Sequence, residues 1–277
     1  MIGLAAVDAD ADRRELVAVH DAVRSQLGVV AVVLVVAGIA WWTTVSRMSG
    51  MDMGPGTSLG TLGWFIGVWA VMMAAMMLPS FAPTAAVYAT LSLRRESSPW
   101  PVFVGGYLIV WSAAGVVAYG LFELGRTLFS GDLTWSGEGR WLSGGVLVLA
   151  AAYQLVPFKR ACLEQCRSPL RVLVEGWNDG RQEALVMGVR SGGWCLGSSW
   201  ALMIALFALG VMSMTWMSLV AALVALEKVA PAPRATRVAT AVALVALALG
   251  VLFSAHDVPG LVVPGSTSAM HMMKTAQ

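Results

Sequence analysis

The sequence predicts an all-α, polytopic transmembrane helix bundle of about seven spans, with the N-terminus inside and the C-terminus outside. Three observations support this prediction. Hydrophobic residues make up 58% of the 277 residues and charged residues only 12%, which is unlike a soluble globular domain. Apolar stretches long enough to cross about 30 Å of hydrocarbon recur along the whole chain. Finally, Lys and Arg gather on one side of these stretches, as they do on the cytoplasmic side of membrane proteins.

Seven apolar stretches are the predicted spans. They are residues 26–44, 61–82 with a helical extension to about 92, 102–123, 141–157, 193–211, 214–229 and 236–254. The first is too long for the core of a signal peptide and lacks a small-residue cleavage site, so we expect an uncleaved helix. With the N-terminus inside, the inner segments contain 14 Lys and Arg residues and the outer segments contain 4. This asymmetry predicts the orientation and explains the net charge of +2 without a nucleic-acid partner.

The predicted spans divide the chain into three regions. Residues 1–25 form a cytoplasmic N-terminal segment, residues 26–255 form the bundle, and residues 256–277 form an extracytoplasmic tail that contains Met and His. Within the bundle, residues 158–190 are too polar to cross a membrane and form a predicted cytoplasmic surface segment. Apolar residues at helical spacing between 169 and 177 predict a short helix on the membrane surface.

The absence of certain residue types from the predicted spans disfavours several function classes. Histidine occurs only at His20, His256 and His271, all outside the spans, so an intramembrane haem or histidine-rich metal site has no ligands. Asp, Glu, Lys and Arg are absent from the span centres, since Glu123 and Glu227 lie at helix ends, and this disfavours a proton-coupled transporter. The sequence also contains no Walker loop or dinucleotide fingerprint.

Four methionines stand close together in the second span, in the stretch WAVMMAAMMLPS. Met72 and Met76 lie one helical turn apart, as do Met73 and Met77, and the four cover an arc of roughly 140°. Soft thioether ligands select Cu(I) among biological metals, so the cluster predicts a copper site. Pro79 follows at once and predicts that the helix bends or ends there. The alternative is that these methionines are flexible packing residues of the bundle.

Cysteine supplies the second group of candidate ligands. In WCLGSSWALM, Cys195 and Met203 lie on one face of the fifth span and are expected to form a wall opposite the four methionines, unless Cys195 is an inert core residue. In KRACLEQCR, Cys162 and Cys166 share one helix face beside Lys159, Arg160 and Arg167. The neighbouring cations should favour thiolate, and the cytoplasmic position argues against a disulfide, so we expect none of the three cysteines to be oxidised.

Two stretches on the predicted outer side also carry soft ligands. RMSGMDMGP contains Met51 and Met53, and STSAMHMMK contains His271 and Met272. Methionine beside histidine in a tail has little packing purpose, so we expect these residues to collect the metal ion or hand it over.

Four motifs together resemble a bacterial family of predicted metal-binding integral membrane proteins, some of which are copper accessory proteins of polyphenol oxidases. The motifs are WAVMMAAMMLPSFAP, YQLVPFKRACLEQCRSPL, GGWCLGSSWALM and the LEK that closes the sixth span, and the similarity covers about residues 60–230. The resemblance implies a multi-pass protein of the bacterial inner membrane that supplies copper to a copper enzyme or to an extracytoplasmic copper carrier. Family members often carry more cysteine in the third motif, where this chain has Ser198 and Ser199. That difference shifts the expected ligands toward methionine and Cys195.

The sequence therefore predicts a membrane protein, not an enzyme, that binds Cu(I) through Met and Cys in a site without buried charge. Its expected partners are membrane lipids and a copper protein, with no nucleic acid, and it acts alone or as a homo- or hetero-oligomer. A neutral site suits Cu(I), because burying a monovalent ion costs less desolvation than burying a divalent one. Two alternatives stay open: a structural or assembly subunit of a larger membrane complex, and an enzyme or carrier for a lipid-like substrate.

Overall fold

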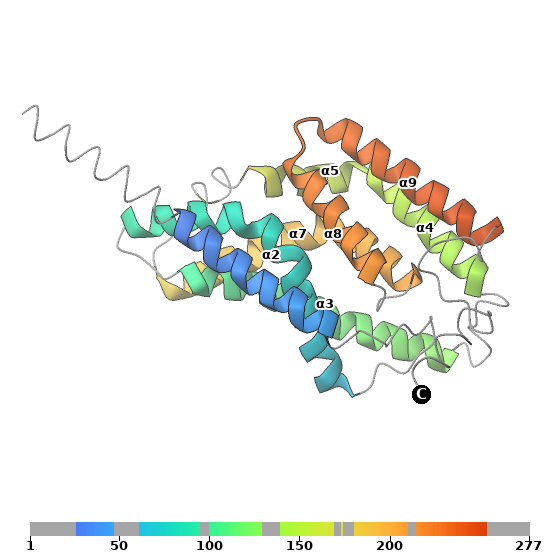
Figure 1. The fold of residues 1–277 in the computed structure, drawn as a ribbon, viewed down its shortest axis with the longest axis horizontal. Helices are drawn as coiled ribbons and strands as arrows, with labels where there is room; N and C mark the ends of the chain where they lie inside the picture. Colours follow the sequence, from blue (N-terminus) through green and yellow to red (C-terminus); the bar gives the residue numbers. More distant parts are fainter. Residues whose placement is uncertain are drawn as a thin grey trace, which may run out of the picture.

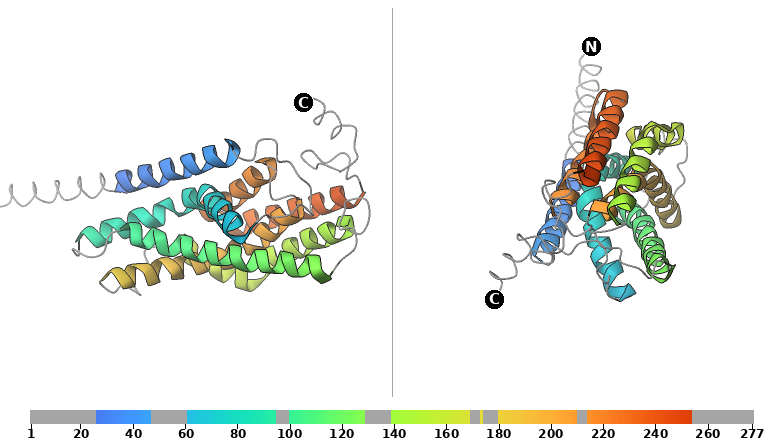
Figure 2. Two further views of the ribbon diagram at one scale, coloured as in Figure 1. Left: turned by 90° about the horizontal axis from the view of Figure 1, so that it is seen from below. Right: turned by 90° about the vertical axis from the view of Figure 1, so that its right-hand side faces the viewer.

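The fold is an all-helical bundle. The computed structural model describes residues 26–46, 61–94, 100–128, 139–168, 173, 180–209 and 214–253. Its helices are Gln26–Ser46, α2 (Leu62–Arg94), α3 (Trp100–Leu128), α4 (Gly139–Leu155), α5 (Pro157–Arg167), α7 (Arg181–Leu209), α8 (Met214–Val229) and α9 (Pro233–Phe253). Figure 1 shows these helices, and the side view in Figure 2 shows that most of them run along one long axis.

Each of the seven predicted apolar stretches is helical over its described residues, apart from the break at Val156 and the first residue of the second stretch. By length and composition, four of the helices can cross a membrane: Gln26–Ser46, α2, α3 and α9. α4 and α5 meet at an angle of 65° and would add a fifth span if they cross as one broken helix. α8 has 16 residues and is only about 24 Å long, shorter than the roughly 30 Å hydrocarbon core. Seven spans and the inside-outside orientation stay predictions.

The polar segment between the fourth and fifth predicted spans is more helical than expected. α5 starts at Pro157, directly after Val156, whose extended backbone (φ −67°, ψ 137°) interrupts α4. Proline is favoured at the first position of a helix, so Pro157 ends one helix and starts the next at a new angle. α7 begins at Arg181, well before residue 193, because a helix can continue past the apolar stretch that hydropathy detects. The surface helix predicted within 169–177 lies outside the described residues, apart from Leu173.

α2 is the most buried of the four spanning candidates. In its most apolar stretch 61% of the residues are buried, against 28% to 33% in the other three spanning candidates. It contains Pro79 and Pro83 yet continues to Arg94, and its ribbon changes direction part-way along (Figures 1 and 2). α2 therefore bends, which is one of the two outcomes that Pro79 predicted. α3 packs against α2 on one side and α7 on the other, while α8 contacts both α2 and α7.

Glycines allow α3 and α7 to lie in close contact. A Cβ atom added to Gly188 of α7 would lie 2.1 Å from the carbonyl oxygen of Phe103, and one added to Gly106 of α3 would lie 2.3 Å from that of Leu185. Gly192 follows Gly188 by four residues and faces Val110 and the backbone of Tyr107. This small-residue spacing is the pattern that lets membrane helices approach. The contact matters for the site below, because α3 carries Tyr107 and α7 carries Cys195.

Changing Gly188→Ala is expected to destabilise the bundle, because the new methyl group meets backbone atoms that cannot rotate away. Overpacking of this kind costs roughly 1–3 kcal/mol, and a contact of 2.1 Å places this variant at the upper end. Gly193→Ala, on the same helix, is the control. Its Cβ would meet nothing within 4 Å, and alanine favours a helix over glycine. Thermal unfolding in detergent should show a lower midpoint for Gly188→Ala only, and equal midpoints would contradict the close contact.

Candidate metal centre

The four methionines of α2 lie inside the bundle. Met73 and Met77 are fully buried, and Met72 and Met76 are each 2% exposed. Their burial places the thioethers in the protein interior and not on a lipid-facing surface. Because the pairs stack one turn apart, the sulfur atoms occupy two successive levels along α2.

Two contacts with α3 fix α2 on either side of the methionine cluster, which we define as Met72, Met73, Met76 and Met77. Before the cluster, the indole Nε1 of Trp69 donates a 2.7 Å hydrogen bond to the carbonyl oxygen of Trp111. After it, Phe81 stacks on Tyr107 with ring centroids 3.9 Å apart and an interplanar angle of 12°. The rotation of α2 about its own axis is therefore set at both ends of the cluster.

A chain of polar contacts leads from the cluster to Cys195. Ser80 Oγ donates to the carbonyl oxygen of Met77 at 2.9 Å. The ammonium group of Lys228, on α8, donates to Ser80 Oγ at 2.9 Å and to Cys195 Sγ at 3.1 Å. Tyr107 Oη lies 3.1 Å from the same sulfur atom. Residues of α2, α3, α7 and α8 thus meet around one thiol.

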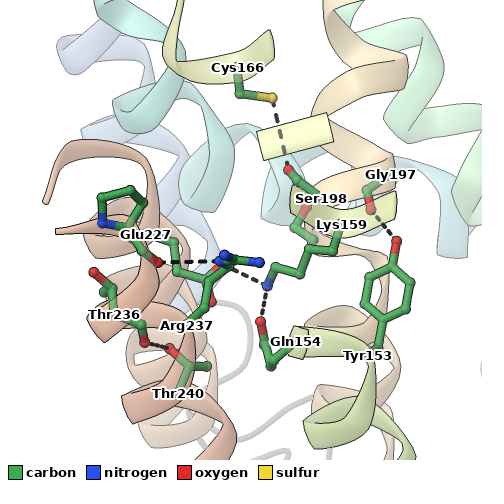
Figure 3. A network of polar contacts seen from close by, with 12 residues as sticks. Tyr153, Gln154, Lys159, Cys166, Gly197, Ser198, Glu227, Thr236, Arg237 and Thr240 are labelled. Carbon is green, nitrogen blue, oxygen red and sulfur yellow. Dashed lines mark hydrogen bonds and ion pairs between the residues drawn. The ribbon is translucent and has the colours of Figure 1, made fainter. Parts of the chain in front are cut away.

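Cys195 and Cys166 line the same small cavity. Other lining residues include Ser80, Trp194 and Lys228, and the cavity measures about 20 Å³, room for about one water-sized particle. Cys166 comes from α5, and its Sγ lies 3.9 Å from Ser198 Oγ (Figure 3). The same Oγ donates to the Cys195 carbonyl oxygen at 2.8 Å. The sequence had placed Cys195 in the bundle and Cys166 in a separate cytosolic pair, and the fold brings the two thiols together.

Cys162 lies one turn before Cys166 on α5 and has different surroundings. It is 1% exposed, and its Sγ lies close to the backbone of Gly197, where an added Cβ would be 2.8 Å from the sulfur. None of the three cysteines is paired with another in the structure, and their oxidation state stays a prediction.

The cations of α5 do not pair with its thiols, contrary to the expectation from the sequence. Arg160 donates to Glu164 at 2.7 Å, and Arg167 donates to the carbonyl oxygens of Glu227 and Ala230 at 2.8 and 2.6 Å. Arg167 therefore satisfies carbonyl groups at the C-terminal end of α8, which have no partner within that helix. Among the described residues, the cation that contacts a thiol is Lys228, on another helix.

Met203 shares the buried face of α7 with Cys195 but lies at a different level. It is 5% exposed and follows Cys195 by eight residues, about 12 Å along a helix. One ion cannot bind both sulfur atoms at that separation. Met203 therefore belongs to another level of the interior than Cys195, and a wall formed by the two opposite the methionines stays a prediction.

A buried ion pair was missed from the sequence. Lys159 of α5 donates to Glu227 of α8 at 2.7 Å and also to Gln154 of α4, and these three side chains are no more than 2% exposed (Figure 3). The sequence placed Glu227 at a helix end, as the structure does, but did not indicate that it would be buried. The sharp turn at Val156 directs α5 back against α7 and α8, which brings Lys159 to Glu227. The only signal in the sequence for a buried charge was the pair Glu227 and Lys228 at the end of an apolar helix.

Four of the predicted ligands, Met51, Met53, His271 and Met272, lie outside the described residues. Among the residues that are described, no three His, Cys, Asp or Glu side chains come together in a way that could hold a metal ion. A metal site in this part of the chain would therefore depend on methionine sulfur or on the two thiols of the cavity.

Comparison with known proteins identifies one family. The family model described as "PpoB2: Copper chaperone" matches residues 66–252, a range that contains the methionine cluster, α5, Cys195 and Lys228. No curated protein and no solved structure matches the chain significantly.

Proposed function

The chain belongs to the PpoB2 family of copper chaperones, and on this basis we propose that it holds copper as Cu(I) on the buried methionine cluster and delivers it to a copper enzyme on the outer side of the membrane. Membership of the family confirms the resemblance that the four sequence motifs indicated. It also means that the chain handles copper for another protein and is not itself an enzyme. The oxidation state, the ligands and the side of delivery are our proposal.

The observation that carries this proposal is the complete burial of four thioethers in six positions. Leucine fills a similar volume with better-defined rotamers, so packing alone gives no reason for four adjacent methionines at the centre of the bundle. Thioether sulfur is a soft ligand that favours Cu(I) over hard cations. Zn²⁺, by contrast, is held by four ligands in structural sites, chiefly thiolate, imidazole and carboxylate, and the described residues supply no such set.

The arrangement supports movement of the ion by steps between ligand sets. The two pairs of methionines form successive levels of α2, Met203 provides a further sulfur atom in the interior, and Cys195 lies beyond Ser80 at the other end of the cluster. Collection or release on the outer side by Met51, Met53, His271 and Met272 is part of the same proposal. An ion held by neutral thioethers is bound without a covalent change of the protein, so it can be passed on to a partner.

Anaerobic metal loading tests the proposal. Protein purified in detergent would be incubated under reducing conditions with Cu(I), and in parallel with Zn²⁺, then desalted and analysed for metal and protein content. We expect Cu(I) to remain bound in stoichiometric amount and Zn²⁺ to be lost. If neither metal remains bound and a second membrane protein co-purifies, the chain acts as an assembly subunit and the proposed copper site is wrong.

A further inference from the structure

The two thiols of the cavity come from different elements of the fold. Cys166 lies near the end of α5, which meets α4 at 65°, and Cys195 lies in the middle of α7. Both line one cavity of about 20 Å³, and Ser198 contacts both, through its Oγ to Cys166 Sγ and to the carbonyl oxygen of Cys195. The pair is 29 residues apart in the sequence, so only the fold brings it together.

The chemistry of this cavity differs from that of the methionine cluster. Each thiol loses its proton when it becomes a metal ligand, so two thiolates and one Cu(I) carry a net charge of −1. A negative complex in the interior needs a compensating charge. Lys228 supplies it, because its ammonium group lines the cavity and lies 3.1 Å from Cys195 Sγ. The charges then sum to zero, whereas the same lysine would repel Cu(I) held by neutral ligands alone.

We propose that Cys166 and Cys195 bind one Cu(I) ion as a two-thiolate site, separate from the methionine cluster, with Lys228 balancing its charge. The proposal rests on the proposed function, since it identifies a second station for the same cargo. Two ligands suit Cu(I), which is stable with two soft donors, and the cavity lacks the four ligands that Zn²⁺ takes. Because its ligands lie on α5 and α7, the bound ion also joins these two helices.

Cysteine variants provide the test, and the chain contains its own control. Cys166→Ser and Cys195→Ser should each lower the copper content by one equivalent, and the double variant should lose no more than either single one. Cys162→Ser should keep the wild-type content, because Cys162 is on the same helix as Cys166 and is buried like Cys195, but its sulfur faces Gly197 and does not line the cavity. Equal losses in all three single variants, or none in Cys166→Ser, would overturn the two-thiolate site.

A measurement on the wild-type protein avoids any effect of substitution on folding. A small thiol-modifying reagent would be applied with and without Cu(I), and the modified cysteines mapped by mass spectrometry. Copper should protect Cys166 and Cys195 together and leave the modification of Cys162 unchanged. Protection of Cys195 without Cys166 would contradict the proposal.

The role of Lys228 is tested through affinity. Competition with a Cu(I) chelator should show weaker binding at the thiol site for Lys228→Gln, by at least about tenfold, since a nearby opposite charge favours a thiolate by that order. Lys228→Arg retains the charge and should recover most of this loss, which a merely structural role of the lysine would not predict. Equal affinities for the Gln variant and the wild type would remove Lys228 from the site.

The results separate this inference from the proposed function. If the wild type binds no copper at all, both fail. If it binds copper that is lost only when the methionines are changed, the copper chaperone mechanism stands and the thiol site is wrong.

Discussion

Replacing Met72, Met73, Met76 and Met77 together by leucine is expected to remove the copper bound by the methionine cluster and leave the fold intact. The exchange of Met for Leu nearly conserves volume, and such changes usually cost less than about 1.5 kcal/mol each, so the buried positions tolerate the new side chains. Leucine has no sulfur and cannot bind the ion. The variant should keep only the equivalent that Cys166 and Cys195 hold.

The control for this variant is Met187→Leu. Met187 is also a buried methionine, 6% exposed, but it lies on α7 two turns before Cys195 and away from the cluster. Copper content and thermal unfolding would be measured for both variants. A folded quadruple variant with wild-type copper content would show that the methionines are packing residues, and an equal loss in Met187→Leu would show that the effect is unspecific.

The helices themselves could be predicted from the sequence because their signal is local. Backbone hydrogen bonding within a helix and apolar length are both properties of a continuous segment, and each of the seven apolar stretches forms helix in its described part. The start of α7 was misplaced by about twelve residues, since RQEALVMGVRSG is polar enough to lower hydropathy but contains no proline to end the helix. Hydropathy detects the apolar part of a helix and not its end.

The methionine cluster could also be recognised from the sequence, but its partners could not. Ser80 and Lys228 are 148 residues apart, and Lys159 and Glu227 are 68 apart. Whether such residues meet depends on how far each helix is rotated about its axis and at what angle helices cross. Periodicity along one helix contains neither quantity. Lys228, which contacts Cys195, was therefore read only as a cytoplasmic positive charge.

Lys159→Met is expected to cause the largest loss of stability among single changes in α5. It leaves the carboxylate of Glu227 buried without its cation, and the Oε1 atom of that group already has no hydrogen-bond partner among the described residues. Removing one partner of a buried ion pair costs roughly 3–5 kcal/mol. Arg160→Met is the matched control, because Arg160 is the next residue and forms an exposed pair with Glu164, for which little change is expected. Equal unfolding midpoints for the two variants in detergent would contradict the buried pair.

The double variant Lys159→Met with Glu227→Leu decides what the pair is for. Replacing both members of a buried ion pair with apolar side chains is often neutral for stability, so most of the loss should be recovered. The pair also links α5 to α8, and these helices carry Cys166 and Lys228. If the double variant unfolds like the wild type but binds copper at the thiol site more weakly, the ion pair positions the site. If the double variant instead has both the stability and the copper binding of the wild type, packing alone holds α5 in place. Each charge of the pair then matters only because it neutralises the other.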